Sequence, residues 1–245
     1  MNYRGRIKKL GRSLIACMDF SSKEPSINEH CTEFEVNNWL LSDFVLAKLI
    51  PTVGVRPFPL SELMMMSATV CRLRPTHIFE WGTHVGKSAR VFYETTRCFK
   101  IECDIHSVDL PDHVAHIEHP GRRRGELVKN LDRIFLHQGD GLETALTIYH
   151  SLGGERRVLF FLDGDHSYES VKREIDGIIR SVKDAWIIVH DTFYQSKESG
   201  YNIGPYQAIE DSLPRIKTMY KIIAQNTGLP GMVLLYRKND FSQPS

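Results

Sequence analysis

Acidic side chains stand at the ends of three predicted strands, where a ligand could reach them. Glu80 is followed by Gly82 and Gly86, Asp109 ends the next strand, and Asp140 lies in a short turn after the third. The glycines permit backbone angles that other residues avoid, and free amides at the following helix start attract an anionic group by about 0.3–1 kcal/mol. Glu80 would repel a pyrophosphate, and the G-x-G-x-x-G spacing of a dinucleotide site is absent. The first strand end therefore favours a positively charged ligand.

Each of these acids suits a different part of one ligand. Glu80 can pair with an ammonium group, and Asp109, one strand–helix–strand unit later, can accept both hydroxyls of a ribose. Asp140, in the turn Gln138-Gly-Asp-Gly141, suits the edge of an adenine. An ammonium, a ribose and an adenine in this order describe S-adenosylmethionine. The alternative is that Glu80 is a solvated acid at a strand end, and for Asp140 a purely structural role is equally open.

A second group of polar residues ends the next two predicted strands. Asp163, Asp165 and His166 follow the fourth strand, and His190 and Asp191 end the fifth. Two neighbouring parallel strands that end this way place these groups around one cavity. An imidazole with an ordinary pKa near 6.5 can take a proton from a hydroxyl, a step worth about 10²–10⁴-fold in rate. His166 is therefore a candidate general base, although it or Asp165 could instead cap the following helix.

The elements that must position these groups alternate along the chain. Short β-branched runs are followed by helices or by connections of helical length, and a Gly-containing loop joins the last two strands. This pattern predicts a doubly wound, mostly parallel α/β sheet of seven strands with a C-terminal antiparallel hairpin. The predicted strands lie near residues 77–81, 104–109, 133–137, 157–162, 185–190, 219–224 and 232–236.

Helical patterns precede this alternation. Residues 33–50 and 60–73 are predicted to be helical, separated by Pro51 and by further Gly and Pro residues that interrupt a continuous helix. The basic first eighteen residues predict a helix packed on the body of the protein, and the alternatives are contact with anionic lipid or a transit segment. We predict one domain over residues 1–245, with an N-terminal helical extension (1–75) and a catalytic α/β core (76–238).

Three motifs at the predicted strand ends resemble those of class I S-adenosylmethionine-dependent methyltransferases. They are Phe79-Glu-Trp-Gly-Thr-His-Val-Gly-Lys-Ser, Phe161-Leu-Asp-Gly-Asp-His-Ser-Tyr-Glu and Val189-His-Asp-Thr. Over roughly residues 60–237 the sequence is most similar to small-molecule O-methyltransferases related to catechol O-methyltransferase, to cephalosporin-hydroxylase-like proteins and to macrolide-sugar methyltransferases. The resemblance implies a Rossmann-like fold and methyl transfer from S-adenosylmethionine to a hydroxyl of a small-molecule acceptor, such as a sugar or a secondary metabolite.

The resemblance also implies roles for individual residues. His166, three residues after Asp163, corresponds to a general base, and Asp163 is the second catalytic residue. Contacts to the cofactor are implied for Glu80, Gly82, Thr83, Gly86, Ser88, Asp109, Asp140 and Asp163. Residues 30–60 and 193–204 are predicted to wall the acceptor site, because substrate contacts in this fold come from variable helices and loops.

A divalent metal such as Mg²⁺ is implied at Asp163, His190 and Asp191, since related enzymes hold magnesium with acids at these strand ends. This sequence departs from that pattern, because His190 stands where an acid is usual. Magnesium prefers oxygen ligands. The site therefore holds either a more nitrogen-tolerant metal or no metal, in which case its groups hydrogen-bond one another.

Composition narrows the class of protein. The 31 basic and 30 acidic residues give a net charge of +1, which provides no overall attraction to nucleic acid or a membrane surface. The sequence contains no run of about eighteen apolar residues, so stable membrane insertion is not expected. The five scattered cysteines without a C-x-x-C pair favour a reducing cytoplasm over a disulfide framework or zinc site. A homodimer through the N-terminal extension is a further hypothesis.

Two other functions compete with methyl transfer. An NAD-dependent oxidoreductase would use the same fold, but the missing G-x-G-x-x-G spacing and the acid at Glu80 disfavour it. A catalytically silent protein that binds S-adenosylmethionine, or a scaffold that assembles through its N-terminal helices, is the other alternative.

Overall fold

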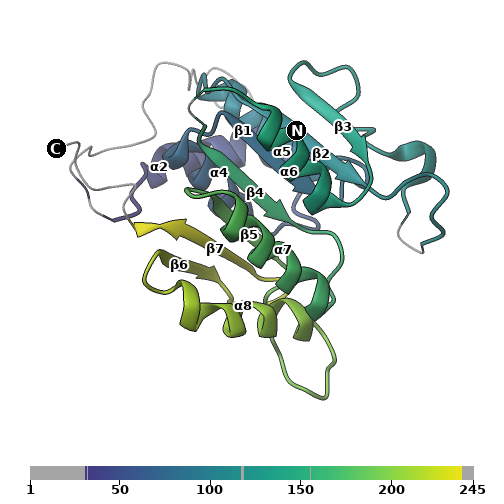
Figure 1. Ribbon diagram of the computed structural model, residues 1–245. Coiled ribbons are helices and arrows are strands. Elements are labelled where there is room, and N and C mark those ends of the chain that lie inside the picture. Colours follow the sequence, from purple (N-terminus) through teal and green to yellow (C-terminus); the bar gives the residue numbers. More distant parts are fainter. Residues whose placement is uncertain (1–30, 32, 117–118, 155, 239–245) are drawn as a thin grey trace, which may run out of the picture.

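Seven strands form one sheet in the order β3-β2-β1-β4-β5-β7-β6 (Figure 1). The computed structural model describes residues 31, 33–116, 119–154 and 156–238, so the predicted basic helix near the start lies outside the described residues. β1 to β5 are parallel, and β7 runs antiparallel to both β5 and β6. The predicted parallel sheet with a terminal hairpin is confirmed. The strands are β1 (His77–Trp81), β2 (Asp104–Asp109), β3 (Ile134–Gln138), β4 (Val158–Leu162), β5 (Trp186–His190), β6 (Tyr220–Gln225) and β7 (Met232–Arg237).

Two helical layers cover the opposite faces of the sheet (Figure 1). One layer contains α2 (Asn38–Phe44), η1 (Val45–Leu49), α3 (Ile50–Val53), α4 (Leu60–Leu73) and α5 (Lys87–Cys98). The other contains α6 (Gly141–Ser151), α7 (Tyr168–Ser181) and α8 (Ile203–Ile216), and a short 3-10 turn, η2 (Gly121–Arg123), lies between β2 and β3. Among the described residues, no helix is both long enough and apolar enough to cross a membrane.

Strand β4 shows how the sequence produces this layering. Alternate side chains of a strand point to opposite faces, so Leu159 and Phe161 enter the core under α4 and α5, while Phe160 and Leu162 enter the core under α7 and α8. All five residues of the strand are buried. The continuous apolar run is therefore a central strand covered on both sides.

The helix α7 is a one-sided cover, as its apolar spacing indicates. Val171, Ile175 and Ile178 are buried against the sheet. The helix begins after Ser167, whose side-chain oxygen accepts a hydrogen bond from the backbone N–H of Ser170 at 3.3 Å. Ser167 therefore caps the helix, and the alternative that His166 or Asp165 supplies the cap is wrong.

The N-terminal helices differ from the prediction at Pro51. The helical run extends from α2 through η1 to the end of α3, so Pro51 lies inside it and Gly54, with a φ of 74°, ends it. The preceding turn is a π-helix, and Pro51 occupies the first turn of α3, where a missing backbone N–H costs little. Pro51 therefore changes the winding of the helix and does not stop it.

Candidate active site

A cavity of about 900 Å³ opens where β1, β4 and β5 end. Its floor contains the loop after β1 (residues 82–85), together with Asp163, His190 and Asp191. Residues 56–58 and Tyr201, from the two segments predicted to wall an acceptor, line its other sides. The carboxyl ends of parallel strands in an open α/β sheet form the usual ligand crevice, so this cavity is the candidate active site.

Gly82 is required where β1 and β4 approach each other. Its φ is 91°, and a Cβ atom built on it would lie 2.0 Å from the backbone oxygen of Asp163. Gly86 also has a positive φ, 86°, and immediately precedes α5. The backbone freedom predicted for both glycines is confirmed.

Glu80 lies behind the cavity wall. It is fully buried, and its Oε1 accepts a hydrogen bond from the hydroxyl of Ser107 at 2.5 Å; Ser107 in turn lies 2.6 Å from the hydroxyl of Thr83. The alternative of a solvated acid is therefore wrong. Glu80 Oε2 is buried without a hydrogen-bond partner among the described residues. A buried carboxylate oxygen left unsatisfied in this way favours a positively charged partner.

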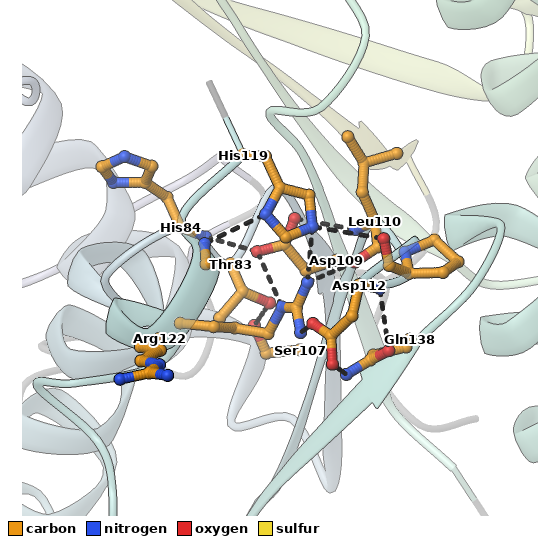
Figure 2. A network of polar contacts seen from close by, with 12 residues as sticks. Thr83, His84, Ser107, Asp109, Leu110, Asp112, His119, Arg122 and Gln138 are labelled. Carbon is orange, nitrogen blue, oxygen red and sulfur yellow. Dashed lines mark hydrogen bonds and ion pairs between the residues drawn. The ribbon is translucent and has the colours of Figure 1, made fainter. Parts of the chain in front are cut away.

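Asp109 is held at the end of β2 by a network of polar contacts (Figure 2). Its two oxygens accept hydrogen bonds from the backbone N–H groups of His84 and Leu110, at 3.0 and 2.8 Å. Arg124 Nε lies 3.5 Å from the same carboxylate, and the guanidinium also donates to Asp112 at 2.5 Å. The run Arg122-Arg-Arg124 predicts a solvated basic segment or a contact with an anionic substrate, so the contact of Arg124 with Asp109 was not expected from the sequence. The ribose contact of Asp109 stays a prediction. Arg124 is the nearby side chain that would compete with a ribose for the Asp109 carboxylate.

Asp140 has a structural role that the structure shows directly. It caps α6, because its Oδ1 accepts a hydrogen bond from the backbone N–H of Glu143 at 2.9 Å, and its Oδ2 pairs with Arg173 at 2.5 Å. The turn that carries it does follow β3, as predicted. Its contact with an adenine edge remains a prediction.

The second group of polar residues meets at the ends of β4 and β5. His190 Nδ1 lies 2.8 Å from Asp163 Oδ1 and 3.4 Å from Asp191 Oδ2. His166 Nε2 lies 3.3 Å from Asp191 Oδ2 and 3.7 Å from Asp163 Oδ1. Asp165 is not part of this cluster, because its carboxylate accepts two hydrogen bonds from Ser167. The structure thus brings together the four residues singled out as catalytic or metal-binding.

Glu62 is a member of the site that sequence reasoning missed. Its Oε2 lies 3.0 Å from His190 Nε2, and its Oε1 accepts a hydrogen bond from the backbone N–H of Gly231 at 2.9 Å. The side chain is buried in α4, 128 residues before its histidine partner. The available signal was one acid in a mainly apolar helical segment, Leu60-Ser-Glu-Leu-Met-Met-Met.

The comparison with protein families decides the class of the protein. The model of the family described as Rhamnosyl O-methyltransferase/CmcI matches residues 56–227, more than half of the chain. The chain belongs to this family. It is accordingly an S-adenosylmethionine-dependent O-methyltransferase, which confirms the predicted enzyme class against the alternative of an NAD-dependent oxidoreductase. The family match includes every residue of the two strand-end groups and Glu62.

Solved structures confirm the methyltransferase fold for this family member. The O-methyltransferase from Bacillus cereus in complex with SAH is 15% identical, with a TM-score of 0.53 over 80% of this chain and 90% of that one. SAH-bound PaMTH1 from Podospora anserina is 15% identical, with a TM-score of 0.53 over 97% of each chain. TomG from Streptomyces achromogenes, involved in tomaymycin synthesis and solved with SAM, is 13% identical, with a TM-score of 0.51 over 97% and 99%. No curated protein matches the chain.

In this O-methyltransferase the two strand-end groups shift carboxyl pKa values in opposite directions. Burial raises the pKa of Glu80 to about 7, although the hydrogen bond from Ser107 opposes the shift. Burial also acts to raise the pKa of Asp163, but the charge of His190 and hydrogen bonds from His166 and His190 outweigh it and lower the value to about 2. Burial thus destabilises the ionised form of Glu80, whereas the histidine neighbours of Asp163 stabilise its ionised form, although both acids follow strands of the same sheet.

The two imidazoles are shifted toward their charged forms. Burial acts to lower the pKa of His190, but the charge of Asp163 and hydrogen bonds to Asp163, Asp191 and Glu62 hold it well above the ordinary value. Burial likewise opposes a rise at His166, where the hydrogen bond to Asp163 and the charge of Asp191 raise the pKa. Both shifts follow from the surrounding carboxylates.

Three donor atoms in this family member could hold a metal ion. Asp163, His190 and Asp191 each offer one ligand atom, and these atoms lie within 4.8 Å of one another. Two carboxylates and one imidazole nitrogen fit a divalent ion that accepts nitrogen, such as Mn²⁺, better than they fit Mg²⁺.

Proposed function

We propose that this O-methyltransferase methylates a hydroxyl group of a small molecule, such as a sugar or a secondary metabolite, with His166 as the general base. The observation that carries the proposal is the position of the His166 imidazole, whose Nε2 lies 3.3 Å from Asp191 beside a cavity lined by Asp163 and Asp191. The cavity volume, about 900 Å³, lies within the range of small-molecule sites.

S-adenosylmethionine supplies an electrophilic methyl group on a positively charged sulfur. The unpaired oxygen of Glu80 supports binding of the cationic end of this ligand, Asp109 would bind its ribose and Asp140 would lie at its adenine. Gly82 and Thr83 from the loop after β1 and Ser88 from α5 line the cavity, and Gly86 immediately precedes α5. Holding donor and acceptor in line supplies most of the rate increase, about 7–11 kcal/mol for well-oriented partners.

His166 would take the proton from the acceptor hydroxyl as the new bond to oxygen forms. Asp191 would orient the imidazole and stabilise the cation that results, as the aspartate of a Ser-His-Asp triad does. The His166 side chain is 40% exposed, so an acceptor can reach it. Because the pKa of His166 is raised, the unprotonated base is depleted at acidic pH, and the rate is expected to rise with pH.

A divalent ion at Asp163, His190 and Asp191 is part of the proposal. When bound, such an ion lowers the pKa of an acceptor hydroxyl. The two carboxylates and His190 Nδ1 would hold it, and the close spacing of these atoms supports that assignment. Removal of the metal with a chelator is expected to lower the rate, and Mn²⁺ is expected to restore it better than Mg²⁺.

Methyl transfer is tested with purified enzyme, S-adenosylmethionine and a panel of hydroxylated acceptors that includes sugars, catechols and polyketide-like phenols. Formation of S-adenosylhomocysteine together with a methylated product supports the proposal. Binding of S-adenosylmethionine by calorimetry without turnover on any acceptor favours the catalytically silent alternative. Turnover that is unchanged in a His166→Ala variant contradicts the assigned base.

Three expectations from the sequence accompany the proposed function. The chain would act as a single domain, in the cytoplasm, as a homodimer that assembles through its N-terminal helices. Sedimentation of the full chain, limited proteolysis and cell fractionation measure these properties directly.

A further inference from the structure

Glu62 is a carboxylate from the N-terminal helical layer that is buried against the second strand-end group. It is 2% exposed. Both of its oxygens are used, one by His190 Nε2 at 3.0 Å and one by the backbone N–H of Gly231 at 2.9 Å. Burial of an ionised carboxylate is costly unless its partners are well placed. The burial of Glu62 therefore depends on the orientation of His190.

The two nitrogens of His190 face different neighbours. Nε2 faces Glu62, and Nδ1 faces Asp163 and Asp191, at 2.8 and 3.4 Å. An ionised carboxylate can only accept hydrogen bonds, so Nε2 must carry the proton in the contact with Glu62. The ring is also held from the side by Phe58, whose centroid lies 5.0 Å away in an edge arrangement. Nδ1, which lies among the carboxylates that line the cavity, is thus the nitrogen that would give up its proton when a metal ion binds there.

We infer that Glu62 is a positioning residue that fixes the orientation and tautomer of His190 so that Nδ1 completes a metal site with Asp163 and Asp191. The inference rests on the metal site of the proposed function. Metal-bound histidines commonly donate their other N–H to a carboxylate, which orients the ring and makes it a stronger ligand. The Glu62–His190 pair also returns a negative charge to the site, which a lone imidazole in place of an acid would have removed.

Binding of Mn²⁺ to the metal-free protein tests the inference without any measurement of activity. Titration calorimetry and electron paramagnetic resonance are used on the wild type, Glu62→Gln and Glu62→Leu. Loss of such a hydrogen-bond partner costs about 10–100-fold in metal affinity, so we expect a weakening in that range. Ser67→Ala is the matched control, because Ser67 is also buried in α4 but contacts Thr95. It should bind Mn²⁺ as the wild type does.

A double-variant comparison separates positioning from general loss of structure. If Glu62 acts through His190, Glu62→Gln should change Mn²⁺ affinity by less than about 2-fold in a His190→Ala background. An equal loss in both backgrounds overturns the inference. Affinity for S-adenosylmethionine should stay unchanged in Glu62→Gln, which shows that the fold and donor site are intact.

Nitrogen-15 NMR of His190 in the full-length wild type provides a measurement that does not depend on folding of the variants. With Zn²⁺ bound, Nε2 should carry the proton and Nδ1 should show the shift of a metal ligand. Protonated Nδ1 at saturating Zn²⁺, or no binding of Mn²⁺ or Zn²⁺ to the wild type, overturns the inference. If the inference fails in this way but methyl transfer is observed, the proposed O-methylation still holds. If metal binds as expected but no methyl transfer is observed, only the proposed function is contradicted.

Discussion

Acidic side chains at the ends of β1 and β2 have different partners from those at the ends of β4 and β5. At the ends of β1 and β2, Glu80 accepts a hydrogen bond from the hydroxyl of Ser107, and Asp109 accepts mainly from backbone amides. At the ends of β4 and β5, Asp163 and Asp191 are paired with two imidazoles. The pKa of Glu80 is raised to about 7 and that of Asp163 is lowered to about 2. The difference lies in the neighbours, because both acids are at the end of a buried strand.

This difference indicates where charge must come from when ligands bind. Within the described part of the chain Glu80 Oε2 has no hydrogen-bond partner, so a ligand that carries positive charge can stabilise the ionised form of Glu80. Asp163 already has His190 and His166 as partners, so the acceptor half is stabilised within the protein. Under the proposed function, the site for S-adenosylmethionine would receive positive charge from its ligand, whereas the neighbouring site for the acceptor is already stabilised by histidines.

The largest expected effect is on turnover, from a substitution at the ends of β4 and β5. His166→Ala should lower kcat by about 10²–10⁴-fold, because it removes the proposed base. Affinity for S-adenosylmethionine should change little. Steady-state kinetics and calorimetry measure the two quantities, and His150→Ala, at an exposed histidine near the end of α6, is the control. An equal loss in kcat and in donor affinity would place His166 in the donor half instead.

The burial of Glu80 at the end of β1 should affect the free energy of unfolding. The folded pKa of Glu80 is raised, so the folded state binds its proton more tightly than the unfolded state and loses stability as pH rises from about 4.5 to about 7. Glu80→Gln should abolish this loss and make the ligand-free protein more stable at pH 8, by on the order of 3 kcal/mol, with no gain near pH 4. Denaturant unfolding at both pH values measures it. Glu102→Gln, at an exposed acid, should show no such gain.

The same substitution should weaken donor binding. Hydrogen bonds to charged groups contribute about 1.5–3 kcal/mol, so Glu80→Gln should lower the affinity for S-adenosylmethionine by about 10–100-fold at pH 8. In the wild type the affinity should fall as Glu80 becomes protonated below about pH 7. Calorimetry across pH 5.5–8.5 distinguishes the two proteins, and a pH-independent wild-type affinity would contradict the assigned role.

The smallest effect concerns Asp140. Asp140→Ala removes the cap of α6 and should cost about 1 kcal/mol of stability, whereas Asp140→Ser keeps a capping oxygen and should recover most of it. If Asp140 also contacts an adenine, both variants should bind S-adenosylmethionine more weakly than the wild type. Equal affinity in all three proteins would leave Asp140 as a cap alone.

Local patterns predicted most of the fold and much of the site. The seven strands and the strand-end acids follow from short runs and motifs whose meaning does not depend on distant residues. Glu62 and Arg124 escaped prediction because their roles depend on packing: Glu62 meets a partner 128 positions away, and Arg124 reaches Asp109 only through a folded loop. Pro51 was mispredicted because a π-helical turn accommodates it. Chemistry at strand ends is thus readable in sequence, whereas the residues that orient it are not.

The junction at Gly82 limits how this enzyme can change. Main chain packs directly on main chain between β1 and β4, so the spacing between the proposed donor and acceptor sites would be set by the backbone and not by side-chain rotamers. New acceptors are therefore more easily accommodated by exchanging the rim, at residues 56–58, Tyr201 and Leu229, than by altering the floor. Transplanting rim segments between family members would retarget the enzyme while its catalytic alignment stays constant.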